Sequence, residues 1–274
     1  MQARVLFARF IAPFVPVIIA VALCSGCVTT DHALQSGPAF TDDAAFRQWF
    51  TFYYQDPHPE QLTAAVKFMQ ANGYLDETPS EGRDMPLIAS VFLSRVMKAH
   101  TSELRQWAAS WQSLGRQEWY VLLVSLYMAD TVESKRVMAA NLHKVDKTHQ
   151  LRLAGMQKLP PSALDPLTGP VQSERQINLL WAGFSASGDL HYVRKVIGAI
   201  PLYGDESGRK AGIGEAALMS LATNALQNET VARECAEVNV RTKDQKTRML
   251  LTAMLAAVAE IARNDQREQD AISH

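Results

Sequence analysis

The chain has 274 residues, of which 47% are hydrophobic, and its 27 basic and 28 acidic side chains give a formal net charge of −1. Proteins bind nucleic acid through an excess of basic side chains that neutralise phosphates, so this balance excludes a nucleic-acid partner. A chain of this length and apolar content can bury a core large enough to hold a fold by packing.

Residues 1–26 are predicted to be a secretory signal peptide. They begin with a basic segment carrying Arg4 and Arg9, continue with a short apolar run over Phe10–Cys24 and end in small residues, which is the composition of such signals. The run holds two prolines and is too short for a comfortable membrane-spanning helix. A retained membrane anchor is the alternative.

Ser25 and Gly26, directly before Cys27, resemble the end of a bacterial lipoprotein signal. The resemblance implies cleavage between Gly26 and Cys27 and lipidation of Cys27, which would anchor the protein to a membrane. Cys24 departs from the pattern, which normally has an aliphatic residue there, so simple cleavage that leaves Cys27 as a thiol is the alternative. Val28, in place of the Asp that retains such proteins at the inner membrane, implies the outer membrane, with the domain facing the periplasm.

Loss of residues 1–26 removes two arginines and leaves 25 basic and 28 acidic side chains, with Cys235 as the only cysteine besides Cys27. No intrachain disulfide is then available, and we expect packing alone to hold the fold. Residues 27–40 mix Thr, Ser, Gly and Pro without periodicity, so we predict that they form the lipid attachment site and a tether.

Residues 41–263 are predicted to form a domain of helical hairpins, because apolar residues recur there at i, i+3, i+4 and i+7. The clearest hairpin covers Glu174–Ile200. Gly188 is expected to close its first helix in the left-handed conformation, and Asp189 to cap the second. The other predicted hairpins span residues 41–73, 86–115, 116–145 and 218–238, with a weaker helix over 148–159.

Three further segments complete the predicted architecture. Asp130, with Glu133 three residues later, predicts a capping box. The stretch that holds Gly204, Gly208, Gly212 and Gly214 predicts a flexible connector. A final helix over residues 245–263 carries apolar residues around most of its circumference, which predicts burial, and residues 264–274 are expected to be a polar tail.

Together these elements predict an all-α fold, an irregular stack of helical hairpins that is similar to an α-solenoid and ends in a buried C-terminal helix. No stretch alternates polar and apolar residues over six positions, so no sheet is expected. Four prolines in residues 159–170 mark a boundary between two lobes.

The C-terminal hairpins resemble a pattern in uncharacterised secreted α-helical proteins of Gram-negative bacteria. The resemblance rests on Ser187-Gly188-Asp189, Tyr192-Val193, Ile197, Ser220-Leu221, Asn224-Ala225 and Val231. It covers about the last hundred residues and implies a helical fold and a secreted location, with no activity and no site residues.

No arrangement of residues predicts catalysis, a metal or a cofactor. The seven histidines are scattered, and none forms a ligand array. Ser185 lacks the GxSxG spacing and the preceding strand of a nucleophile elbow. A cluster of Trp107, Trp111 and Trp119 is the one candidate interaction site, since aromatics are enriched at binding hot spots; the hydrophobic core is the alternative.

These observations favour a non-enzymatic, membrane-tethered binding or scaffold lipoprotein with a protein or peptide partner. Two alternatives stay open: an envelope enzyme whose catalytic carboxylates come from distant helices, and a periplasmic inhibitor or immunity protein. A pocket with two facing carboxylates of separated pKa would favour the enzyme. A groove rimmed with charge would favour a binding protein. The identity of the partner and the oligomeric state stay open too.

Overall fold

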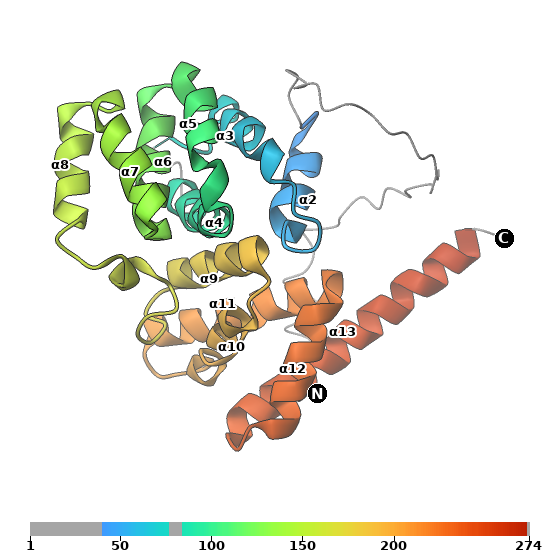
Figure 1. Cartoon of the computed structure of the whole chain (residues 1–274). Helices are drawn as coiled ribbons and strands as arrows, with labels where there is room; N and C mark the ends of the chain where they lie inside the picture. Colours follow the sequence, from blue (N-terminus) through green and yellow to red (C-terminus); the bar gives the residue numbers. More distant parts are fainter. Residues whose placement is uncertain (1–39, 77–83, 273–274) are drawn as a thin grey trace. The chain divides into compact units, whose positions relative to one another are not determined.

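The computed structural model describes residues 40–76 and 84–272, so the signal peptide, Cys27 and nearly all of the tether lie outside the described residues. The described residues form twelve α-helices and no strand (Figure 1), which confirms the all-α prediction. The helices are α2 (Asp43–Phe52), α3 (Leu62–Ala71), α4 (Met85–Ala99), α5 (Leu104–Ser110), α6 (Arg116–Ala129), α7 (Val132–Asn141), α8 (Lys147–Met156), α9 (Glu174–Ser187), α10 (Leu190–Ile197), α11 (Gly208–Gln227), α12 (Glu229–Arg241) and α13 (Gln245–Ile272).

The hairpins form the predicted irregular stack, but their spatial order differs from their order in the chain. α4 packs against both α6 and α9, and α9 in turn packs against α11. The hairpin α9–α10 therefore lies against α4, the first helix of the second hairpin, as Figure 1 shows. The long connection through α8 and residues 157–173 gives the chain enough length to return there.

Two hydrophobic cores lie on either side of the proline-rich segment 159–170. The first consists mainly of side chains from Phe40 to Leu153, with two alanines of α9, and the second is built from residues 177–254. α9 belongs to both cores, because Ala182 and Ala186 pack in the first while Ile177 packs in the second. The two cores are thus joined by a shared helix, and Pro38–His274 forms one unit.

Arg95 of α4 links three parts of the chain. Its Nε donates to the Tyr192 hydroxyl on α10 at 2.6 Å, and its Nη2 lies 2.8 Å from Oδ2 of Asp165 in the proline-rich segment. The Arg95 side chain is only 11% exposed, and burial raises the pKa of Tyr192. Removal of either partner would leave a buried charge without compensation, which destabilises the fold.

The expected turn at Gly188 is confirmed. Gly188 has φ +67° and ends α9, and the Asp189 carboxylate caps α10 by accepting from the His191 N–H at 2.9 Å. A Cβ at position 188 would lie 2.5 Å from the ring of Tyr54. That ring is fixed in place, because the Tyr54 hydroxyl donates to Asn228 at 3.1 Å.

Gly188→Ala should therefore lower the free energy of unfolding by about 2–3 kcal/mol, since a positive φ and overpacking against Tyr54 both oppose the methyl group. Gly204→Ala is the matched control: Gly204 has φ +66°, but a Cβ added there would meet no atom within 4 Å. We expect about 1 kcal/mol there. Urea denaturation of both variants measures the difference, and equal losses would show that the Tyr54 ring makes room.

The predicted capping box at Asp130 is wrong. Asp130 ends α6 in the left-handed conformation with φ 52°, and Thr131 caps α7. The Thr131 side chain accepts from the Ser134 N–H at 3.0 Å, and the Ser134 hydroxyl accepts from the Thr131 N–H at 2.9 Å. Glu133 instead binds Arg105 of α5. Asp and Thr both make good caps, so adjacent candidates cannot be separated without the backbone conformation.

The C-terminal helix is longer and less buried than expected. α13 runs to Ile272, beyond the predicted end at residue 263, because the segment contains no Gly or Pro and is rich in good helix formers. Its buried residues are Thr247, Leu251 and Met254, and residues 262–270 are all exposed. The apolar stripe ends at Ile261, so only one face of the first half of α13 packs on the second core.

Candidate ligand-binding groove

The predicted tryptophan cluster lies in the first core. Trp111 and Trp119 are fully buried and Trp107 is 6% exposed. The Trp111 Nε1 donates to Thr63 at 3.2 Å, and the rings of Trp111 and Trp119 meet edge to face at 6.0 Å. The structure thus places these three side chains in the first core, with almost no exposed surface.

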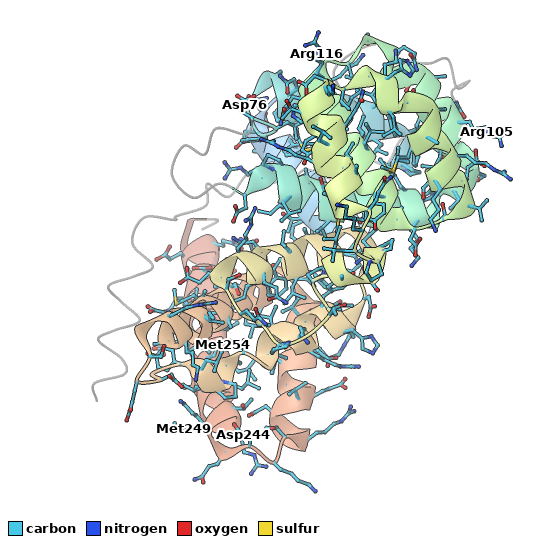
Figure 2. All side chains as sticks on the ribbon, turned by 90° about the vertical axis from the view of Figure 1, so that its left-hand side faces the viewer. Asp76, Arg105, Arg116, Asp244, Met249 and Met254 are labelled. Atoms are coloured by element: carbon cyan, nitrogen blue, oxygen red, sulfur yellow. The ribbon has the colours of Figure 1, made fainter. Side chains whose placement is uncertain are left out.

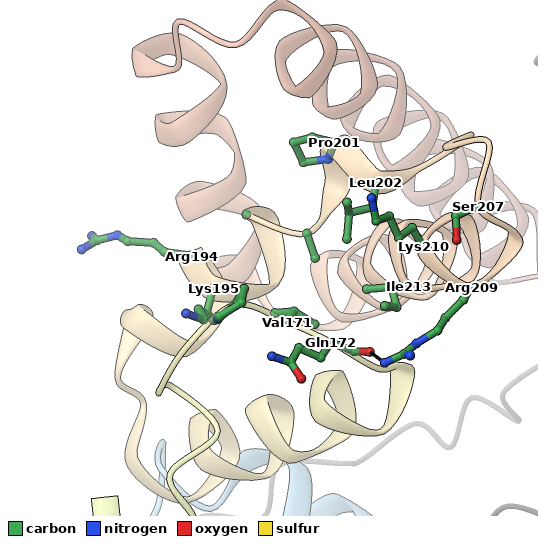
Figure 3. Close-up of a pocket in the computed structure, with 13 residues that line it drawn as sticks. Val171, Gln172, Arg194, Lys195, Pro201, Leu202, Ser207, Arg209, Lys210 and Ile213 are labelled. Atoms are coloured by element: carbon green, nitrogen blue, oxygen red, sulfur yellow. Dashed lines mark hydrogen bonds between the residues drawn. The ribbon is translucent and has the colours of Figure 1, made fainter. Parts of the chain in front are cut away.

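A cavity of about 630 Å³ lies in the second half of the chain, and we refer to it as the groove (Figure 3). It is bounded by the irregular segment 170–172, the C-terminal part of α10, the turn at 198–202 and the first turns of α11. Its lining residues are Pro170, Val171, Gln172, Arg194, Lys195, Gly198, Ala199, Pro201, Leu202, Ser207, Arg209, Lys210 and Ile213.

Beside the groove, α11 approaches the preceding turn very closely. A Cβ at Gly214 would lie 2.0 Å from the backbone nitrogen of Tyr203, so only glycine fits at this position. The contact fixes the start of α11 against residues 202–203, and Figure 3 shows Lys210 of its first turn beside Leu202.

The flexible connector predicted over the four glycines is therefore mostly wrong. α11 begins at Gly208, and only Gly204 lies in the preceding turn. Gly214 is buried within the helix, and its lack of a side chain lets α11 pack closely on the backbone of residues 202–203. The glycine-rich composition alone does not distinguish a loop from a tight contact, because glycine permits both.

Every charged residue that lines the groove is basic. Arg194 points away from the centre in Figure 3, and its Nε lies 2.6 Å from Glu234. Arg209 donates to the backbone oxygen of Gln172 at 3.0 Å. Across the described part of the chain, no carboxylate lies within ion-pair distance of Lys195 or Lys210. These two ammonium groups are available to a negatively charged ligand.

The wall between the cations is apolar. Val171 and Leu202 pack at the edge of the second core, and Ile213 is buried in it. A ligand with an aliphatic part and a carboxylate would place its aliphatic part on this wall and its carboxylate beside the lysines. The lining holds one hydroxyl, on Ser207, and neither a histidine nor a carboxylate that could serve as its base.

Two carboxyl groups outside the groove, Glu133 and Asp146, have lowered pKa values. The hydrogen bond from Arg105 lowers the pKa of Glu133, and the His149 N–H lowers the pKa of Asp146. Both interactions stabilise a charged carboxylate, the opposite of the raised pKa that a general acid needs. Within residues 40–76 and 84–272, no group of His, Cys, Asp or Glu side chains has the arrangement of a metal site.

None of the helices that the structure describes combines the length and the apolar character needed to cross a bilayer. Comparisons with protein-family models, with curated proteins and with solved structures gave no match. The resemblance of the C-terminal hairpins to a secreted helical family therefore stays a prediction. The groove itself was not predicted, because its two free lysines lie on different elements, 15 positions apart.

Proposed function

We propose that the chain is a membrane-tethered, non-enzymatic binding lipoprotein whose groove holds an acidic segment of a protein or peptide partner. The observation that carries the proposal is the lining of the groove: four basic residues, an apolar wall and no carboxylate. A groove rimmed with charge of one sign is the feature that favours a binding protein over an enzyme. The tether is supported by the resemblance of residues 1–27 to a lipoprotein signal.

The groove fits an extended segment better than a folded domain. Its volume of about 630 Å³ is within the range of sites that enclose a small ligand or a few side chains. Lys195 and Lys210 would pair with carboxylates of the segment, and an aliphatic side chain between those carboxylates would rest on Leu202 and Ile213. Attraction of this kind weakens as salt screens the charges.

Peptide binding tests the proposal. The full chain, extracted from membranes in mild detergent, is titrated into a fluorescent peptide of alternating Glu and Leu, and anisotropy reports binding. We expect Lys195→Glu/Lys210→Glu to weaken binding by about tenfold or more, because two attractions become repulsions. The same protein should not bind a peptide of alternating Lys and Leu.

Lys147→Glu/Lys158→Glu is the matched control, since it makes the same change in net charge at two exposed lysines that do not line the groove. Equal weakening in both variants would reject the groove as the site, and cleavage of the peptide would favour the enzyme alternative. Cys27→Ala tests the tether separately: we expect the protein to leave the membrane fraction and to retain peptide binding.

A further inference from the structure

A second exposed feature lies at the end of the α12–α13 hairpin, at residues 240–249, which we call the hairpin tip. The Asn239 side chain donates to the hydroxyl of Thr252 at 3.1 Å, so the two helices run antiparallel and the tip is their free end. Figure 2 shows Met249 and Asp244 at this end, with Met254 nearer the core.

The tip exposes two large apolar side chains. Val240 is 82% exposed, the highest value among the large hydrophobic residues that the structure describes, and Met249 is 63% exposed. Val240 follows Val238, which packs against the second core, and Met249 precedes Leu251, which is buried in that core. Isolated apolar residues on a surface are ordinary, but two at the end of one projecting hairpin are a candidate contact.

The tip is also strongly basic. It carries Arg241, Lys243, Lys246 and Arg248 against one acidic residue, Asp244. Asp244 accepts from the Thr247 N–H at 2.6 Å at the start of α13, and the side-chain hydrogen bond with Thr247 is the main cause of its lowered pKa.

Among the tip's cations, Arg241 pairs with Glu237 at 3.1 Å and Arg248 donates to the backbone oxygen of Thr242. Lys243 and Lys246 have no ion pair within the described chain.

We infer that the hairpin tip contacts an anionic lipid surface. Exposed apolar side chains enter the boundary between headgroups and acyl chains, while lysine and arginine attract anionic headgroups. The tip offers two exposed large apolar side chains, Val240 and Met249, which provide far less area than the roughly 800 Å² per partner that a stable protein interface buries. This contact does not depend on the groove or on its ligand.

Fluorescence of a labelled tip tests the inference. The protein from residue 27 onward carries Cys27→Ala, so that no acyl chain contributes, and Met249→Cys receives an environment-sensitive, thiol-reactive fluorophore. Cys235 does not compete for the label, since it is fully buried and burial raises its pKa to about 12. Leu151→Cys on α8, at a residue that is 65% exposed, is the matched control.

We expect the emission of the label at position 249 to shift to the blue with vesicles of anionic lipid and to stay unchanged with zwitterionic vesicles. The label at position 151 should respond to neither. Lys243→Gln/Lys246→Gln should raise the half-saturating lipid concentration about 25-fold, at about fivefold per lysine. Lys195→Gln/Lys210→Gln in the groove should leave it unchanged.

Three outcomes would overturn the inference. The label at position 249 could show no shift with anionic vesicles. The emission of labels at positions 249 and 151 could shift equally, which would indicate non-specific adsorption. The emission of the label at position 249 could shift with protein concentration in the absence of lipid, which indicates that the tip binds a second copy of the chain.

Discussion

Gly214→Ala should lower the free energy of unfolding by about 3 kcal/mol or more, the upper end of the cost of overpacking a core. The added methyl group would lie 2.0 Å from the backbone nitrogen of Tyr203 and 2.4 Å from the carbonyl carbon of Leu202. Backbone atoms cannot rotate away as a side chain can, so α11 or the turn at 200–203 must shift. Urea denaturation followed by circular dichroism measures the loss, and peptide binding should fall with it because the groove deforms.

Gly155→Ala is the control for Gly214→Ala. Gly155 lies in α8, is exposed, and would place an added Cβ in open space, with no atom within 4 Å. Alanine there should raise stability by about 0.5–1 kcal/mol, since glycine is the poorer helix former. The two substitutions are chemically identical. Opposite signs of the change in the free energy of unfolding would therefore show that the close packing of α11 at Gly214 causes the loss. If Gly214→Ala were as stable as the natural protein, α11 would not pack on residues 202–203 as described.

Arg95→Met should lower the free energy of unfolding by about 2–3 kcal/mol. Loss of one partner from a buried ion pair costs about 3–5 kcal/mol, and the partial exposure of Asp165, 29%, reduces that figure. The Tyr192 hydroxyl would also lose its donor. Arg95→Lys should recover little, because a single ammonium group cannot bind both partners in the fork geometry of a guanidinium.

Arg105→Met is the comparison for Arg95→Met. The Arg105 side chain is 73% exposed and pairs with Glu133 at 2.5 Å, and an exposed pair of this kind contributes little to stability because water and salt screen it. Urea denaturation of the three variants and the natural protein gives the values. Equal losses for Arg95→Met and Arg105→Met would show that the Arg95 cluster has no special role in joining the two cores.

Some features that depend only on neighbouring residues were predictable from the sequence, although the cap at Thr131 was not. The left-handed conformation of Gly188 and the cap at Asp189 depend on the local chain, and both are confirmed. The helical stripes likewise located the hairpins, since each stripe records which face of a helix is buried. The end of α13 was missed because the apolar pattern stops at Ile261 while the helix continues. Beyond Ile261 the helix continues although its side chains are exposed, so the end of the apolar pattern does not mark the end of the helix.

Features that depend on distant contacts were not predictable. Gly214 owes its identity to Tyr203, across a turn, and a single sequence does not show that approach. The tryptophans at helical spacing fit both a core and a surface until their neighbours are placed. Lys195 and Lys210 look like ordinary solvated residues in the sequence, and only the fold brings them to one groove. Arg95 and Tyr192 meet across 97 positions of the chain.

The position of α9 against α4 has a consequence for how the protein reaches its folded state. Residues of α4 and α9 that pack together are separated by roughly ninety positions, and Ala182 and Ala186 complete the first core. A chain that is synthesised from its N-terminus cannot complete the first core until residue 186 has been made. Contacts of such long separation slow folding and leave apolar surface uncovered meanwhile. Such a chain would expose apolar surface of the first core to holding chaperones until more than two thirds of its length is present.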